Sequence, residues 1–235
     1  MRPRSRQLTL DQARKPDGRH GGWRPNSGRP RGRTTTSHDA RAPFASTYPL
    51  HVTLRIAEGL PSLRRDDVLT TVRAALQAGG DKVGFRVVEF NLLGNHLHLL
   101  VEANGAVALA RGMQGLKVRL ARRINTTLRR RGALFAERYH ARVLKTPTEV
   151  RNALRYVLLN GRKHAAERGQ RLFRGWVDPF SSAPWFAGWR EPIRSTAPWL
   201  VALKRLPRPT AEPRTWLLAT GWRLRGLLDL DDVPG

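Results

Sequence analysis

Two histidines stand one residue apart in the stretch EFNLLGNHLHLLVEA, which spans residues 89–103. In a β-strand, side chains two positions apart point to the same face of the sheet. A strand through this stretch would therefore place His96 and His98 on one face, and Leu97, Leu99 and Val101 on the other. The apolar face would pack in a core. The two imidazoles are either ordinary polar-face residues or a pair that holds a ligand.

The sequence on either side of this stretch predicts a mixed α+β fold. Alternating or short apolar runs predict strands at residues 48–56, 83–93, 95–103 and 138–145. Apolar residues that recur every three or four positions predict helices at residues 63–80, 107–132 and 146–162. The expected order is strand, helix, strand, strand, helix, strand, helix.

The composition favours an anionic partner. The chain of 235 residues has a formal net charge of +25, and 40% of its residues are hydrophobic, which is enough for a core. Such an excess of Lys and Arg favours a phosphate backbone, whose counterions are released on binding. The absence of cysteine excludes disulfides, thiolate zinc sites and cysteine nucleophiles. Without a long apolar run or a secretory signal, we expect a cytoplasmic protein, nucleoid-associated when bound, with no membrane partner.

The two ends of the sequence differ in composition from its middle, residues 48–170. Residues 1–47 are rich in Gly, Pro and Arg without an apolar period, which predicts a disordered basic arm. Within it, GRPRGR at residues 28–33 resembles the core of an AT-hook, and a solvated basic tail is the alternative. Residues 171–235 are rich in Trp and Pro and predict an irregular C-terminal extension with one short helix near its end. We expect most of its tryptophans to serve core packing.

The predicted helix at residues 107–132 has a face with positive charge only. A solvated helix face usually mixes both signs, so this face favours an anionic partner, and a plain soluble face is the alternative. The candidate DNA-binding residues on it are Arg111, Lys117, Arg119, Arg122, Arg123, Arg129 and Arg130.

The predicted helix at residues 146–162 carries a second polar stripe. Thr146 and Glu149 have the spacing of a capping box. Tyr156 and Asn160 lie one turn apart and away from the apolar stripe. A tyrosine hydroxyl can attack phosphorus and an amide oxygen can bind a metal ion, while the alternative for Tyr156 is a half-buried, hydrogen-bonded ring. We expect Gly161 to end the helix just after Asn160.

These motifs, in this order, resemble the single-tyrosine HUH transposases of the IS200-like transposase family, in which HUH stands for His-hydrophobic-His. GNHLHLLVEA is similar to the family's histidine strand, and ALRYVLLNGRKH is similar to its tyrosine helix. The Tyr-x-x-x-Asn spacing of YVLLN resembles the REP-associated tyrosine transposase branch. The resemblance implies a ferredoxin-like antiparallel sheet with helices on one face, a catalytic domain at residues 48–170 and an extension at residues 171–235.

The resemblance also implies an activity and a site. The protein would be a DNA transposase that cleaves and rejoins single-stranded, hairpin-containing DNA through a 5′-phosphotyrosine intermediate. Tyr156 would be the nucleophile, and His96, His98 and Asn160 would hold Mg²⁺ or Mn²⁺. Lys163 joins the expected DNA-binding residues, and the resemblance is compatible with a monomer or a homodimer.

Two other functions remain open for the same residues. One is a domesticated DNA- or RNA-binding protein that has lost catalysis. The other is an RNA-binding ferredoxin-like module, whose sheet usually presents aromatic residues on its open face. The strand here presents histidines, which favours the nuclease.

Overall fold

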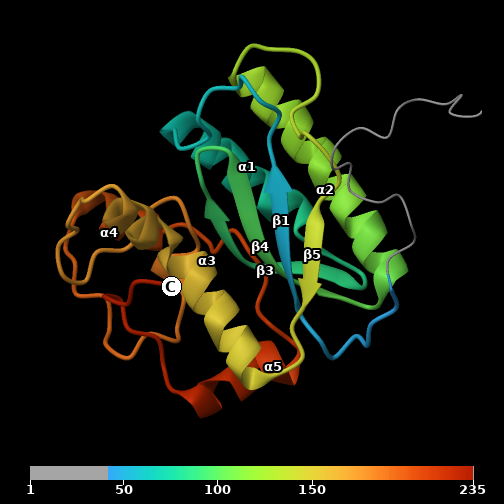
Figure 1. Ribbon diagram of the computed structural model, residues 1–235. Coiled ribbons are helices and arrows are strands. Elements are labelled where there is room, and N and C mark those ends of the chain that lie inside the picture. Colours follow the sequence, from blue (N-terminus) through green and yellow to red (C-terminus); the bar gives the residue numbers. More distant parts are fainter. Residues whose placement is uncertain (1–41, 235) are drawn as a thin grey trace, which may run out of the picture. The chain divides into compact units, whose positions relative to one another are not determined.

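An antiparallel sheet of five strands forms the centre of the fold (Figure 1). The computed structural model describes residues 42–234, so most of the predicted basic arm, with its AT-hook-like segment, lies outside the described residues. The strands are β1 (Leu50–Arg55), β2 (Asp81–Lys82), β3 (Phe85–Leu92), β4 (His96–Ala103) and β5 (His140–Val143). Their order across the sheet is β2-β3-β4-β1-β5.

The strand connections are those of a ferredoxin-like fold. Apart from the two-residue β2, the strand β1 lies between β4 and β5, and β3 pairs with the other edge of β4. Helix α1 (Asp66–Gly79) follows β1, and helix α2 (Ala106–Thr127) connects β4 to β5. The predicted α+β class and the predicted antiparallel sheet are confirmed.

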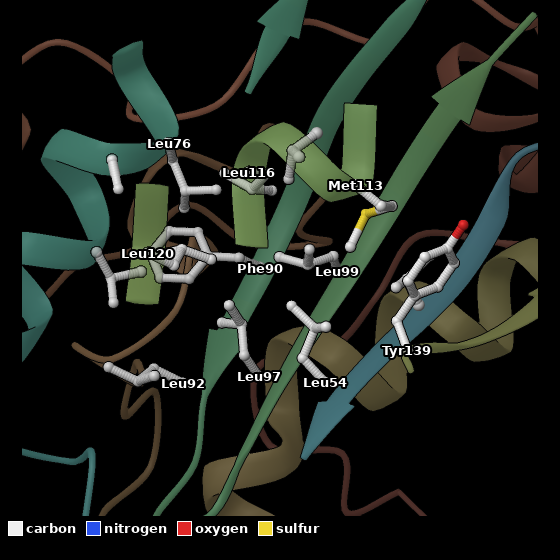
Figure 2. Packing of buried hydrophobic residues seen from close by; sticks show 14 of the residues in the cluster. Leu54, Leu76, Phe90, Leu92, Leu97, Leu99, Met113, Leu116, Leu120 and Tyr139 are labelled. Carbon is white, nitrogen blue, oxygen red and sulfur yellow. The ribbon is translucent and has the colours of Figure 1, made fainter. Parts of the chain in front are cut away.

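One face of the sheet packs with α1 and α2 around the larger hydrophobic core (Figure 2). Alternate residues of the strands point into it, among them Leu54, Leu97 and Leu99. The buried residues of α2 recur every third or fourth position, as at Met113 and Leu116. Each fully buried leucine contributes about 1.5–3 kcal/mol relative to an exposed one, so this face supplies much of the driving force for folding.

The opposite face of the sheet is covered by α3 (Pro147–Glu167) and by C-terminal segments. Val88 and Leu100 of the sheet belong to a second hydrophobic cluster with Val150, Leu154 and Trp222. The expectation of helices on one face therefore holds for α1 and α2, whereas α3 covers the other face. Its apolar stripe is buried against the side of the sheet that carries the histidines, so β3 and β4 are buried on both faces.

The strand β3 contains a β-bulge between Val87 and Glu89. Val88 has no partner on β4, and this extra residue shifts the alternation of side chains along β3. Arg86 and Asn91 are five positions apart, yet they pair with residues four positions apart on β4. Both therefore lie on the face that α3 covers.

The helix α3 begins as predicted and ends later than expected. Thr146 Oγ1 accepts a hydrogen bond from the Glu149 backbone N–H at 3.2 Å, and Glu149 Oε2 accepts one from the Thr146 N–H at 3.1 Å. The expectation that Gly161 ends the helix is wrong, because α3 continues to Glu167. Gly161 serves close packing instead, since a Cβ at this position would overlap the carboxylate of Asp178.

The C-terminal part contains more helix than the sequence predicts. Its elements are α4 (Pro198–Lys204), α5 (Trp216–Ala219) and two short 3₁₀ helices at Ala183–Trp185 and Gly221–Arg225. The single short helix expected near the end corresponds to α5, and α4 was not predicted. Trp189 and Trp222 are buried in the core, whereas Trp176 and Trp185 are half-buried and Trp199 and Trp216 are exposed, so the expectation of core packing holds for only part of these rings. Between residues 42 and 234, no helix is long and apolar enough to cross a membrane.

Two glycines of α2 give a matched test of the larger core. A Cβ at Gly112 would overlap the ring of buried Phe85, whereas a Cβ at Gly115 would meet nothing within 4 Å. We expect Gly112→Ala to lower the free energy of unfolding by about 1–3 kcal/mol through overpacking. We expect Gly115→Ala to raise it by about 0.5–1 kcal/mol, because alanine is the better helix former. Urea unfolding measures both changes, and effects of the same sign would contradict this packing.

Candidate active site

Aromatic rings from three elements meet between the sheet and α3. His98 of β4 lies opposite Thr53 of β1 and Asn91 of β3 in the strand register. The ring centroids of His96 and His98 are 6.1 Å apart and the two ring planes are nearly parallel. The two histidines therefore share one face of the sheet, as alternation predicts. Tyr156 of α3 lies edge-on to His98, with ring centroids 5.3 Å apart.

A third histidine joins this group from β1. The ring centroid of His51 is 5.2 Å from that of His98 and 5.7 Å from that of Tyr156. His51 Nε2 and Thr53 Oγ1 each lie 3.2 Å from His98 Nδ1. No motif marks His51 in the sequence. Alternation along β1 could have found it, because His51 and Thr53 occupy the polar positions of that strand.

Hydrogen bonds engage the Nδ1 atoms of both motif histidines. His96 Nδ1 donates to Asn95 Oδ1 over 2.7 Å, since an amide oxygen can only accept. The neutral His96 ring therefore keeps its lone pair at Nε2. His98 Nδ1 is engaged by His51 and Thr53, and neither motif Nε2 is hydrogen-bonded to a residue in the described range. Rings oriented through one nitrogen and open at the other are typical of metal-binding histidines.

Burial keeps these imidazoles uncharged. Desolvation, helped by the neighbouring histidines, lowers the pKa of His98 to about 3. Desolvation, helped by His140 and Arg142, lowers the pKa of His51 to about 4. The pKa of His96 is also lowered, chiefly by its partial burial. All three rings are therefore neutral at pH 7, which is the form of imidazole that binds metal ions.

Asn160 is a buried amide without hydrogen bonds. Its exposed fraction is 0%, and neither Oδ1 nor Nδ2 has a partner within the described part of the chain. It lies one helical turn after Tyr156 and one before His164, and the charge of His164 acts on the pKa of both His96 and His98. Asn160 thus belongs to the stripe of α3 that faces the histidines. Leaving a buried polar group unpaired costs about 1–3 kcal/mol, so a ligand for this amide would relieve a real penalty.

A buried carboxylate supports this end of the site. Asp178, which is 1% exposed, accepts hydrogen bonds from Arg64 at 3.1 and 2.9 Å and from Asn91 Nδ2 at 3.2 Å. It also packs against Gly161, the residue after Asn160. Asp178 therefore ties the strand residue opposite His98 to the turn of α3 that carries Asn160. The sequence gives no signal for this contact, because its partners are far apart in the chain.

Tyr156 is half-buried and borders a pocket of about 450 Å³. His51, Arg142 and Arg155 also line this pocket. Lys163 Nζ lies 5.6 Å from the centroid of the Tyr156 ring, which is cation–π geometry. Arg142 pairs with Glu149 at 3.0 Å and Arg155 with Asp232 at 3.4 Å, so among the described residues Lys163 is the cation near the phenol that is left free for an anionic ligand such as a phosphodiester.

The basic face of α2 lies on the other side of the sheet from Tyr156. The helix packs in the core with α1, whereas Tyr156 packs against the cluster beneath α3. Lys117 donates to the Glu137 carbonyl at 2.8 Å, Arg130 bonds to Asn125, and Arg119 packs on Gly79. The exposed members of this face are Arg111, Arg122, Arg123 and Arg129. Of the eight predicted DNA-binding residues, Lys163 is the one that contacts Tyr156 in the described part of the chain.

The lowered pKa values predict a pH-dependent stability. In the unfolded chain His51 takes up a proton near pH 6.5, whereas in the folded protein it stays neutral down to about pH 4. The contribution of neutral His51 to the free energy of unfolding is therefore complete above pH 6.5, and it is lost as the pH falls from 6.5 to about 4. We expect the stability advantage of the parent protein over His51→Gln to shrink by about 2 kcal/mol between pH 7.5 and pH 5. Urea unfolding in EDTA measures it, and a constant difference would contradict a buried neutral ring.

Part of the chain matches a known protein family in sequence. Residues 46–158 match the sequence model of the family described as "Transposase IS200 like". No curated protein matches the chain. Among solved structures, the chain is similar to one described as "Structure of the REP associates tyrosine transposase bound to a REP hairpin". The TM-score is 0.45 and the identity 14%, over 63% of this chain and 82% of that one. The stretch that runs from β1 through the histidine strand to the tyrosine of α3 is an IS200-like transposase domain.

Proposed function

We propose that this protein cleaves and rejoins single-stranded DNA through a covalent bond to Tyr156. The observation that carries the proposal is the edge-on contact of Tyr156 with His98, 5.3 Å between centroids, at a histidine pair whose Nε2 atoms are open. The family match supports the class of reaction. Hairpin-containing DNA as the substrate, and a catalytic domain at residues 48–170 followed by an extension at residues 171–235, are parts of the same proposal.

The donor atoms of the site fit a divalent metal ion. No three His, Cys, Asp or Glu side chains within residues 42–234 are grouped to hold a metal, so a third ligand must be of another kind. The unpaired amide of Asn160 supplies an oxygen, and His96 and His98 supply two neutral nitrogens. A bound Mg²⁺ or Mn²⁺ ion would place positive charge beside the scissile phosphate. Asn95 and Thr53 would orient the two imidazoles through their Nδ1 atoms.

The chemical step makes one bond and breaks one. Tyr156 Oη attacks phosphorus and gives up its proton, while the bond from phosphorus to the 3′ oxygen breaks and that oxygen takes up a proton. The 5′ phosphate remains as an ester of Tyr156, and the bond energy is kept for rejoining. A 3′-hydroxyl then attacks the ester, and the phenol is regenerated. Lys163, 5.6 Å from the ring centroid, would favour the developing negative charge on the phenol oxygen.

The two basic regions would contact different parts of the DNA. Lys163 lies near the Tyr156 ring without an ion pair in the described range and would bind a phosphate of the strand being cut, whereas Arg142 and Arg155 would have to exchange Glu149 and Asp232 for phosphates. The exposed arginines of α2 lie on the opposite side of the sheet from Tyr156, so they would bind DNA outside the segment that reacts. Phosphate contacts of this kind position a nucleic acid without reading its sequence.

A covalent adduct tests the reaction directly. We expect the parent protein, incubated with a labelled hairpin-bearing single strand and Mn²⁺, to form a protein–DNA adduct that survives detergent electrophoresis. Tyr156→Phe should lose the adduct completely, because its ring keeps the packing but lacks the attacking oxygen. Tyr139→Phe is the matched control and should keep the adduct, since Tyr139 lies in the core with α1 and α2.

Two outcomes would contradict this reaction. An adduct that persists in Tyr156→Phe would assign the nucleophile to another residue. DNA binding without any adduct, across a panel of hairpins, would favour the inactive DNA-binding protein, and tighter binding to RNA would favour the RNA-binding module.

Metal binding can be tested without any catalytic readout. We expect MnCl₂ at 100 times its dissociation constant to raise the stability of the parent protein by about 2.7 kcal/mol, measured as a shift in Tm. Asn160→Leu should lose most of that shift and should not be less stable without metal, because it removes an unpaired buried amide. Asn152→Leu, an exposed position on the same helix, should keep the full shift. Equal metal shifts in both variants would exclude Asn160 from the site.

A further inference from the structure

A second pocket lies at the N-terminal end of α3, away from Tyr156. Its volume is about 1190 Å³, and five segments of the chain line it. They are the residues just before β1, the β2–β3 hairpin, the end of β4, the residues that lead into α3, and the start of α5. Figure 1 shows α5 beside the N-terminal end of α3, and the two helices are in contact. The site described above uses none of these segments.

The charges at the floor of this pocket neutralise one another. Arg86 and Glu102 are both buried and lie 3.6 Å apart. Glu102 also accepts hydrogen bonds from the backbone N–H groups of Arg214 and Thr215 at 2.8–3.0 Å. Asp81, at the rim, is 4.0 Å from Arg86. The acidic groups of the pocket are therefore engaged by Arg86 and by the backbone.

Three cations at the pocket are left without a counter-ion. Lys82, Lys145 and Arg214 line it, all three are exposed, and none forms an ion pair with another residue in the described range. They come from three of these segments and border the same hollow. An arrangement of this kind complements a group that carries several negative charges, such as a run of phosphates.

The pocket also has an exposed aromatic ring that is held from one side. Trp216 lines it and is 58% exposed, which is unusual for so large an apolar side chain. The ring packs closely on Gly221, where a Cβ would lie 2.7 Å from a ring carbon. Val83, at the tip of the β2–β3 turn, is a second apolar side chain that is fully exposed at the pocket. A fixed ring surrounded by cations matches a stacking platform for an unpaired base.

We propose that this pocket binds an unpaired nucleotide of single-stranded DNA, with its base on Trp216 and the adjacent phosphates beside Lys82, Lys145 and Arg214. The choice of DNA as the ligand rests on the proposed function. Pro147 at the pocket and Tyr156 at the other site are nine residues apart on α3, which corresponds to about 14 Å along the helix. One strand can therefore occupy both places, so the pocket fixes which phosphate reaches Tyr156.

Binding measurements in the Tyr156→Phe background test this pocket apart from catalysis. The probes are a fluorescent DNA hairpin with unpaired flanks and the same hairpin with no flanks, titrated at one salt concentration. We expect Trp216→Ala to weaken binding of the flanked hairpin by about 5–100-fold and to leave the unflanked hairpin unchanged. Trp216→Phe should restore much of the affinity. Trp199→Ala, at an exposed tryptophan of α4 outside the pocket, should bind both probes as the parent does.

Salt dependence tests the cations. Replacing Lys82 or Arg214 by Gln should lower the slope of log K against log salt by about 1 for the flanked hairpin only. Circular dichroism checks that each variant is folded. If Trp216→Ala does not fold, the test uses Trp216→Phe in its place.

Several results would overturn the proposal. They are an unchanged affinity of folded Trp216→Ala for the flanked hairpin, an equal loss with both hairpins, or a loss confined to an RNA of the same sequence. A missing Tyr156 adduct in the parent protein would refute the proposed reaction and leave these binding results standing.

Discussion

The burial of both faces of β4 is the constraint on which the rest of the structure depends. One face of this strand closes the core with α1 and α2, and the other is closed by α3. The histidines on the second face are therefore dehydrated by the same packing that stabilises the fold. Their neutral state follows mainly from desolvation, which disfavours the charged imidazolium. A strand at the edge of the sheet with the same sequence would leave both rings in water.

Much of the architecture could be predicted from periodicity and capping. The histidine strand, the long helix α2 and the capping box at Thr146 and Glu149 follow from local sequence rules and are present in the structure. These features depend on neighbours within a few positions. The position of Tyr156 on α3, outside the apolar stripe, also follows from local helical spacing.

The remaining features depend on contacts between distant segments. The register of β1 against β4 brings His51 to His98, and no local pattern encodes a register. Gly161 was expected to stop α3, but the carboxylate of Asp178 occupies the space where a side chain would be. The side of the sheet that α3 covers, and with it the separation of Tyr156 from the basic face of α2, is likewise a property of the assembled chain.

The bulge in β3 accommodates one residue more than regular pairing with β4 allows. Because the bulge takes up Val88, the residues on both sides of it keep their faces, and Asn91 faces Asp178 beside His98. A regular β3 of the same sequence, without the bulge, would place Leu92 toward the histidines and Asn91 in the core. Deleting Val88 would instead leave an unbulged ladder with Asn91 still opposite His98, so the bulge is what lets the strand hold one more residue and keep the supporting network on the side of the histidines.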